Sequence, residues 1–288
     1  MNGEHIPVLL GHVIDKLVGV TSRLFVDATI GGGGHAYHIL ERYEDIQVIG
    51  IDVDEEALEI AQRRLWRFKD RVLLIQGNFR DLKALLKQRG VSSFDAILFD
   101  LGLSTYQLMG KRGFSFNSEA FLDMRMDQRA ALTAYDVVNR YTYTKLYNML
   151  KNFGEEKKAT KIAQMIIQER KKKPITTAQE LSRIVCEVKK RRTRLHPATQ
   201  TFQAIRMEVN KELDNIETGI HHAMDMLAPG GRIGVISFHS LEDRIVKNMF
   251  KQTPSFQIIT KKPIVPGRDE IRTNPSARSA KLRIAEKV

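Results

Sequence analysis

The sequence predicts an α/β fold in which a doubly wound, mostly parallel sheet is interrupted by an inserted helical domain. Three observations lead to this prediction. Short apolar runs alternate with helical patterns over the first hundred residues, the alternation stops between about Leu103 and Pro197, and it then resumes. Alternating strands and helices build parallel sheets, and continuous apolar runs suit strands that helices cover on both faces. We therefore expect a sheet domain over 1–104 and 198–288, with an inserted helical domain over 105–197.

The first hundred residues read as four strands joined by helices. The expected strands are Leu24–Ala28, Gln47–Ile51, Val72–Ile75 and Phe94–Phe99. The expected connecting helices are one through Ile39 and Leu40, then Glu55–Phe68 and Leu82–Gln88.

The net charge of +12 is concentrated in two segments. Residues 155–194 hold 13 Lys and Arg against 5 Asp and Glu, and residues 261–288 hold 8 against 3. Within the first segment, 155–172 and 177–192 read as two basic amphipathic helices separated by a proline break at Pro174. Clustered cations suit a surface that binds a polyanion, although solvated helix faces would show the same pattern.

The alternation of strand and helix resumes beyond the insertion. Apolar residues recur every three or four positions from Phe202 to Leu227, which predicts one long helix. Arg232–Phe238 then reads as a strand and Ser240–Phe250 as a helix.

The composition is that of an ordinary globular protein, with 42% hydrophobic and 28% charged residues. The sequence contains no run of 18 apolar residues, which a membrane span would need, and its N-terminal part lacks the pattern of a signal peptide. A single cysteine, Cys186, excludes an internal disulfide, and no cluster of Cys and His has the spacing of a zinc site. We expect a cytoplasmic protein that holds no metal and contacts no membrane.

A glycine-rich loop follows the first strand, in the run Asp27-Ala-Thr-Ile-Gly-Gly-Gly-Gly-His35. Gly31-x-Gly33-x-x-Ala36, with Asp52 farther on, fits the fingerprint of dinucleotide-binding proteins. A pyrophosphate, however, needs a helix N-terminus free of nearby anions.

Three expected strand ends carry Asp27, Asp52 and Asp100, and such an acidic crevice favours S-adenosylmethionine, whose sulfonium and ammonium outweigh its one carboxylate. The bland alternative is that Asp27 and Asp100 only cap neighbouring turns. Phe79 follows the third strand, where its ring could stack on an adenine or could simply belong to the core.

Beyond this loop, long ordered motifs over nearly the whole chain resemble the bacterial family that methylates the exocyclic N4 of one cytidine in small-subunit ribosomal RNA (RsmH, also called MraW). The motifs are HIPVLL (5–10), GGGGH (31–35), DLGLSTYQL (100–108), RGFSF (112–116), LDMRMD (122–127), YNMLKNFGEE (147–156), HPATQTFQAIRMEVNKEL (196–213), GGRIGVISFHSLEDRIVK (230–247) and NPSARSAKLRIAEK (274–287).

The resemblance implies a Rossmann-like S-adenosylmethionine-dependent methyltransferase whose helical insertion recognises RNA. Its substrate would be a cytidine in the decoding region of 16S ribosomal RNA within the small ribosomal subunit, and a homodimer stays open. The cofactor-binding residues that it implies are Gly33, Gly34, His35, Asp52, Phe79, Asp100 and Gln107.

The sequence departs from the family pattern at three places. Ser104-Thr105-Tyr106-Gln107 stands where many members have Ser-Ser-Pro-Gln. Gln200 and Ser276 each replace a usual arginine, which removes two cations from expected RNA contacts.

An exocyclic amine is a poor nucleophile, so an enzyme that methylates it must orient it and accept its hydrogen bonds. Asp100 is the first candidate for this acceptor, although the cofactor could occupy it fully. His239 could take a proton near neutral pH, or it could support a capping sequence formed by Ser240-Leu-Glu-Asp243.

The target base must leave its RNA stack, and Phe114 or Phe116 could stack on it or pack between the domains. Arg125 is expected to join the domains through an ion-pair network with Asp123 and Asp127.

Three rival functions remain at the level of sequence. The first is a DNA or small-molecule methyltransferase on the same fold, and the second is an NAD(P) oxidoreductase. The third is an RNA-binding assembly factor without catalysis.

Overall fold

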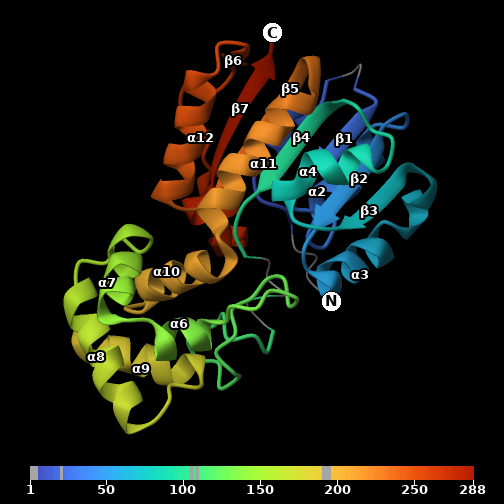
Figure 1. The fold of residues 1–288 in the computed structure, drawn as a ribbon. Helices are drawn as coiled ribbons and strands as arrows, with labels where there is room; N and C mark the ends of the chain where they lie inside the picture. The colour runs from blue at the N-terminus through green and yellow to red at the C-terminus, as the bar shows by residue number, and fades with distance from the viewer. Residues whose placement is uncertain (1–5, 20–21, 104–106, 108–109, 190–195) are drawn as a thin grey trace. The chain divides into compact units, whose positions relative to one another are not determined.

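The computed structural model describes residues 6–19, 22–103, 107, 110–189 and 196–288. The chain divides into two compact units, Met1–Gly102 with Leu213–Val288 and Leu103–Glu212, which we call the first and the second unit (Figure 1). No helix in the described ranges is both long and apolar enough to cross a bilayer. The sequence departure at Ser104-Thr105-Tyr106 lies outside the described residues.

The first unit is built on a seven-stranded sheet with the order β3-β2-β1-β4-β5-β7-β6. Strands β1 to β5 run parallel, and β7 pairs antiparallel with both β5 and β6. This arrangement confirms the predicted α/β class with a mostly parallel sheet. The strands are β1 (Leu24–Asp27), β2 (Gln47–Asp52), β3 (Val72–Gln76), β4 (Phe94–Asp100), β5 (Leu227–Ser237), β6 (Phe256–Ile258) and β7 (Lys281–Lys287).

Helices cover both faces of this sheet, so the first unit has three layers. Alternate residues of β4 separate the two cores: Ile97 and Phe99 face one, Ala96 and Leu98 the other. The first core is completed by α4 (Leu82–Lys87), α11 (Glu212–Met226) and α12 (Ser240–Gln252). The second is completed by α1 (Leu10–Leu17), α2 (Gly34–Arg42) and α3 (Glu55–Arg64).

The expected helix over Glu55–Phe68 is shorter in the structure. It ends at Arg64, and a 3-10 helix, η1 (Trp66–Arg71), replaces its last turn, with Phe68 outside helical geometry. Another short 3-10 turn, η2 (Phe79–Asp81), precedes α4.

The C-terminal segment is part of the sheet, which its charge alone did not predict. Between β6 and β7 lie α13 (Arg268–Thr273) and η3 (Pro275–Ser279). Leu282 and Ile284 of β7 are fully buried, and the intervening Arg283 forms a 2.6 Å ion pair with Asp243 of α12. A strand can bury an arginine side chain when a neighbouring carboxylate neutralises its charge.

The second unit is helical, as expected, and has its own core. Its helices are α6 (Ala134–Arg140), α7 (Tyr143–Asn152), α8 (Ala159–Lys172), α9 (Ala178–Lys189) and α10 (Thr199–Asn210). Because α10 packs in this core, the second unit extends to Glu212, beyond the expected boundary at residue 197. The end of the expected basic helix at 190–192 lies outside the described residues.

The prediction of one long helix from Phe202 to Leu227 was wrong. Lys211 lies between α10 and α11 in the left-handed region, with φ of 51°, and breaks the helix. The Asn210 side chain holds the break, because it accepts a 2.8 Å hydrogen bond from Met126 N–H and donates one to the carbonyl of Met124. The apolar stripe is continuous in sequence, but it serves two different cores.

Candidate active site

Three aspartates lie at the end of the sheet where the strand order reverses. Asp27, Asp52 and Asp100 are the last residues of β1, β2 and β4. Strand β1 has β2 on one side and β4 on the other, so the connections leave it in opposite directions. A crevice opens at the carboxyl ends of the strands at such a reversal, and ligands of α/β proteins bind there. The structure thus brings together the three acids that the sequence analysis singled out.

Each of these carboxyl groups is held in a poorly hydrated place. Loss of hydration raises the pKa of Asp27 to about 7, with the charge of Asp52 adding to the effect. It likewise raises the pKa of Asp52 to about 6. The pKa of Asp100 rises to about 8 through loss of hydration and repulsion from Asp27 and Glu242. A crevice of uncompensated carboxyl groups favours a cationic ligand and disfavours a phosphate.

The glycine loop is held by the crevice acid Asp52. The Gly31 N–H donates a 2.9 Å hydrogen bond to Asp52 Oδ2, and both Gly31 and Gly33 are in the left-handed region with φ of 50° and 75°. Gly33 is the residue before α2, and a Cβ on Gly34 would lie 2.7 Å from the ring of Pro7. The loop therefore needs glycine for conformation at Gly33 and for space at Gly34.

His35 links the N-terminal segment to the crevice. Its ring is buried, Nε2 lies 3.0 Å from the carbonyl oxygen of Val8, and Nδ1 lies 3.7 Å from Asp100 Oδ2. A carbonyl oxygen only accepts, so Nε2 donates this hydrogen bond, and Nδ1 faces the Asp100 carboxyl group. The Asp100 backbone N–H donates to Thr29 Oγ1 at 2.6 Å, a contact that sequence reasoning missed.

Asp100 itself is open to a ligand. Its side chain is 26% exposed, and Oδ1 is buried yet accepts no hydrogen bond from any described residue. A buried acceptor without a donor is costly unless a ligand supplies one. The carboxylate oxygens of the crevice therefore suit a ligand with a cationic group or with an N–H that donates a hydrogen bond.

Phe79 is the first residue of η2, which follows β3, and its side chain is half-buried. Its ring packs edge-on against Phe99 at 5.6 Å, and a Cβ on Gly219 of α11 would lie 2.6 Å from it. The ring is thus partly core, and its stacking on an adenine stays a prediction. Gln107 belongs to the second unit, so its expected contribution to the crevice stays a prediction too.

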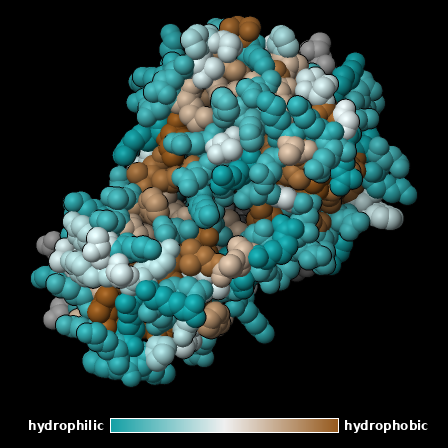
Figure 2. Space-filling view, in the orientation of Figure 1, coloured by the Kyte–Doolittle hydropathy of each residue, from teal (hydrophilic) through white to brown (hydrophobic). Residues whose placement is uncertain are grey.

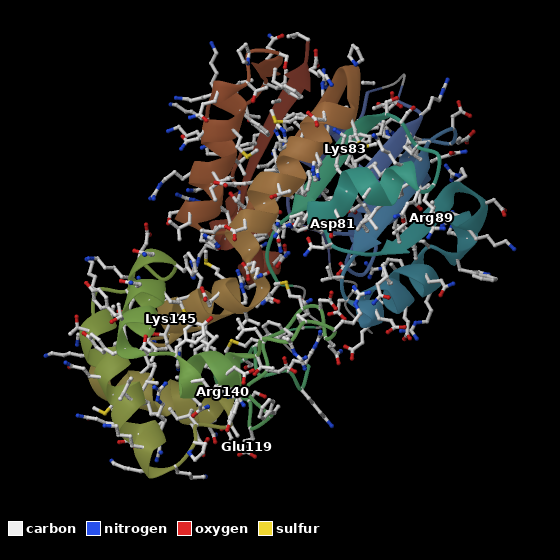
Figure 3. All side chains as sticks on the ribbon, in the orientation of Figure 1. Asp81, Lys83, Arg89, Glu119, Arg140 and Lys145 are labelled. Carbon is white, nitrogen blue, oxygen red and sulfur yellow. The ribbon has the colours of Figure 1, made fainter. Side chains whose placement is uncertain are left out.

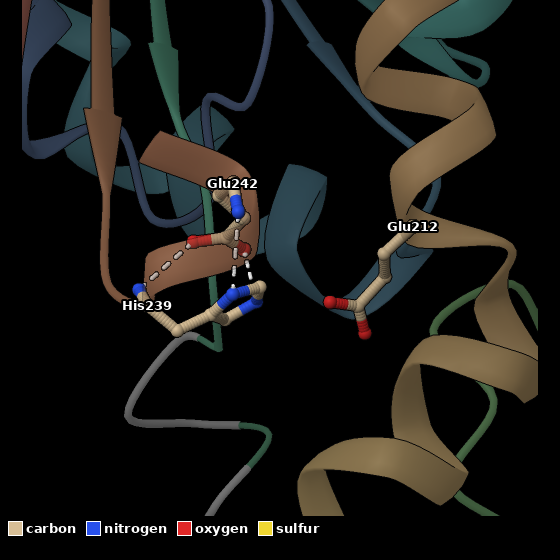
Figure 4. Close-up of side chains that lie close together, drawn as sticks. All are labelled: Glu212, His239 and Glu242. Carbon is tan, nitrogen blue, oxygen red and sulfur yellow. Dashed lines mark hydrogen bonds and ion pairs between the residues drawn. The ribbon is translucent and has the colours of Figure 1, made fainter. Parts of the chain in front are cut away.

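His239 is the N-cap of α12 (Figure 4). Its Nδ1 accepts from the Glu242 N–H, while the Glu242 carboxylate accepts from the backbone N–H of His239 and of Phe238. The expected capping sequence began one residue later, at Ser240; that register was wrong, because the imidazole nitrogen does the work of a hydroxyl. Sequence reasoning also missed Glu242, a buried acid that raises the pKa of Asp100.

The aromatic and acidic motifs at the start of the second unit pack inside that unit. Phe114 is buried in its core, and Phe116 stacks on His196 with ring centroids 4.5 Å apart. Arg125 pairs through two hydrogen bonds with Asp123, while Asp127 pairs with Arg129 instead. The expected ion pair of Arg125 with Asp123 therefore forms, whereas Asp127 pairs with a different arginine.

Many of the cations in the 155–194 segment already have partners. Lys172, Lys173 and Lys189 each pair with a glutamate of the second unit, with N–O distances of 2.7, 3.2 and 2.7 Å. Arg170 donates to two backbone carbonyls near α6. The described cations of this segment that form neither an ion pair nor a side-chain hydrogen bond are Lys157, Lys161, Lys171 and Arg183.

The chain is similar to known proteins in sequence and in fold comparisons. The profile of the MraW methylase family matches residues 2–288. Ribosomal RNA small subunit methyltransferase H of Persephonella marina is 50% identical over 291 residues, which are 99% of each chain. The protein of the same name from Carboxydothermus hydrogenoformans is 44% identical over 309 residues, with 100% of this chain and 99% of that one covered. Among solved structures, an rRNA methylase from Streptococcus thermophilus covers 97% of this chain and 92% of its own, at 14% identity and a TM-score of 0.42.

Proposed function

The chain belongs to the MraW methylase family, and from this premise we propose that it methylates the exocyclic N4 amine of one cytidine in the decoding region of 16S ribosomal RNA. The methyl donor is S-adenosylmethionine. The observation that carries the proposal is the acidic crevice at the reversal of strand order, which suits a cationic donor.

Asp52 and the glycine loop would hold the donor. Each Asp52 oxygen already accepts one backbone N–H, from Gly31 or from Asp54, and each retains a second lone pair for a ribose hydroxyl. Gly33 and Gly34 let the loop pack closely against Leu65 and Pro7, because a Cβ there would lie 3.2 Å and 2.7 Å from their side-chain atoms, and His35 fixes the start of α2 through its contact with the Val8 carbonyl. The bound cofactor would supply an electrophilic methyl group on a sulfonium.

Asp100 is the group best placed to receive the acceptor amine. Its unpartnered Oδ1 can accept a hydrogen bond from an exocyclic N–H, which localises the nitrogen lone pair. With a pKa raised to about 8, the carboxylate is also a competent base near neutral pH. Nδ1 of His35 lies 3.7 Å from its Oδ2. His239 is engaged in the α12 cap, which favours a structural role over proton transfer.

The inserted unit would provide RNA recognition. Its unpaired cations suit phosphate contacts, whose contribution falls as salt rises. RNA within the small ribosomal subunit is the substrate form that we propose.

Mass spectrometry of nucleosides from small-subunit RNA tests the proposal directly. Cells that lack the protein should lose N4-methylcytidine, and the purified enzyme should restore it on subunits from those cells. Naked RNA and DNA serve as parallel acceptors that separate the rival methyltransferases. An unchanged amount of N4-methylcytidine in the deleted strain would refute the proposed methylation of the cytidine N4 amine.

A further inference from the structure

Helix α12 and the strands β6 and β7 lie at the edge of the first unit (Figure 1). Residues of these elements and of the segment after β6 line a basic groove. Strand β6 is the last strand of the sheet, whereas the crevice aspartates lie on β1, β2 and β4. The groove has a volume of about 650 Å³, within the usual range of ligand sites. Its lining residues are Lys247, Phe250, Lys251, Gln257, Ile258, Thr260, Lys261 and Arg283.

The charge of the groove is positive and uncompensated. Lys247, Lys251 and Lys261 are exposed, and none forms an ion pair or a side-chain hydrogen bond within the described chain. Arg283 is neutralised by Asp243, and no acidic residue is among the described residues that line the groove. Lys247 and Lys251 lie one turn apart on α12, so their ammonium groups project along the same helix face.

The floor of the groove is apolar. Phe250 and Ile258 belong to the core beneath it, and the exposed Gln257 adds an amide at its rim. The space-filling view shows apolar patches between hydrophilic ones over this part of the first unit (Figure 2). Cations around an apolar floor are the combination with which proteins hold single-stranded nucleic acid, in which phosphates meet lysines and a nucleoside lies on the floor.

We propose that this groove binds a single-stranded segment of the substrate RNA, away from the nucleotide that is methylated. The inference rests on the proposed function, because an RNA substrate is the polyanion that the enzyme must hold. Phosphates would contact the three lysines, and one sugar and base would lie over Ile258. The groove would therefore set RNA affinity and leave the cofactor site unchanged.

The test combines a loss variant and a gain variant. Lys247→Ala, Lys251→Ala and Lys261→Ala together should weaken binding of a single-stranded RNA oligonucleotide by about tenfold or more at 0.15 M salt. The slope of log affinity against log salt should fall by about 2, since each phosphate contact on a single strand contributes about 0.7. Gln257→Lys should do the reverse, because it adds a cation at the rim.

A matched control removes three exposed, unpaired cations from α3, from α4 and from the turn after α4: Arg63→Ala, Lys87→Ala and Arg89→Ala. Figure 3 labels Arg89. This variant should bind RNA like the wild type. Fluorescence anisotropy over a range of salt measures affinity and slope, and methyl transfer to subunits should show a raised KM with kcat and cofactor affinity unchanged. Thermal unfolding checks that all variants fold.

An unchanged affinity and salt slope in the triple lysine variant would overturn the inference. So would an equal loss of affinity in the control variant, because the effect would then follow the net charge of the protein and not the groove. If the wild type transfers no methyl group to RNA, the proposed function fails, and the binding measurement still decides the groove by itself.

Discussion

The acidity of the crevice predicts that cofactor affinity depends strongly on pH. Asp100 and Asp27 have pKa values raised to about 8 and about 7, so both are largely protonated at pH 6. A sulfonium is held best by ionised carboxylates, and its binding must therefore expel protons. Affinity for S-adenosylmethionine should rise with pH, by roughly tenfold per unit below pH 8 for Asp100 alone, and more steeply below pH 7.

Isothermal titration calorimetry between pH 6 and pH 8 measures this dependence. S-adenosylhomocysteine is the matched ligand, because it has the same amino and carboxylate groups but a neutral sulfur. Its affinity should change much less with pH. The variant Asp100→Asn should flatten the dependence for S-adenosylmethionine between pH 7 and pH 8, since the group that titrates there is gone.

A dissociation constant that stays within a factor of two from pH 6 to pH 8 would refute the reasoning. An equal pH dependence for both ligands would refute it too, because the effect would then come from the shared amino acid moiety. In either case the carboxyl groups would not be coupled to the sulfonium.

The remaining predictions concern stability. Gly34→Ala should lower both cofactor affinity and stability, by about 1–3 kcal/mol, because its Cβ would lie 2.7 Å from a proline ring carbon; Gly11→Ala, which meets no atom within 4 Å, is the control in denaturant unfolding. Lys189→Met should lower the free energy of unfolding by about 3 kcal/mol, because it leaves the Glu156 carboxylate buried and without its ion-pair partner. Urea unfolding measures this change, and a midpoint equal to that of the wild type would show that the ion pair does not contribute to stability. Lys211→Gly should raise the melting temperature, by a gain of about 1 kcal/mol, since glycine adopts a φ of 51° without strain; a lowered melting temperature would contradict the left-handed break.

Local patterns in the sequence were enough to predict five of the seven strands of the sheet, β1 to β5. The strands β1 to β4 are continuous apolar runs, and three of them end in the acids that meet at the crevice. The glycine loop could also be predicted from the sequence, because a run of four glycines has few structural uses. These features depend on residues close together in the chain.

Other features depend on contacts between distant segments. The pairing of β7 with β5 places Arg283 beside Asp243 and turns an apparently basic tail into an edge of the sheet. The break at Lys211 could not be read from a continuous apolar stripe, because the stripe does not show which core each half will face. The pairing of Lys172, Lys173 and Lys189 similarly shows that clustered charge overstates the cations left for RNA.

The sequence by itself determined that this chain would place Asp27, Asp52 and Asp100 at strand ends around a glycine loop. Only the tertiary structure decided how those acids behave. Their raised pKa values come from lost hydration and from mutual repulsion, and both depend on which strands are neighbours and on the burial of Glu242 beside Asp100. The end of a strand can be predicted from residues that are neighbours in the sequence, whereas electrostatic coupling depends on the distance between charges in space.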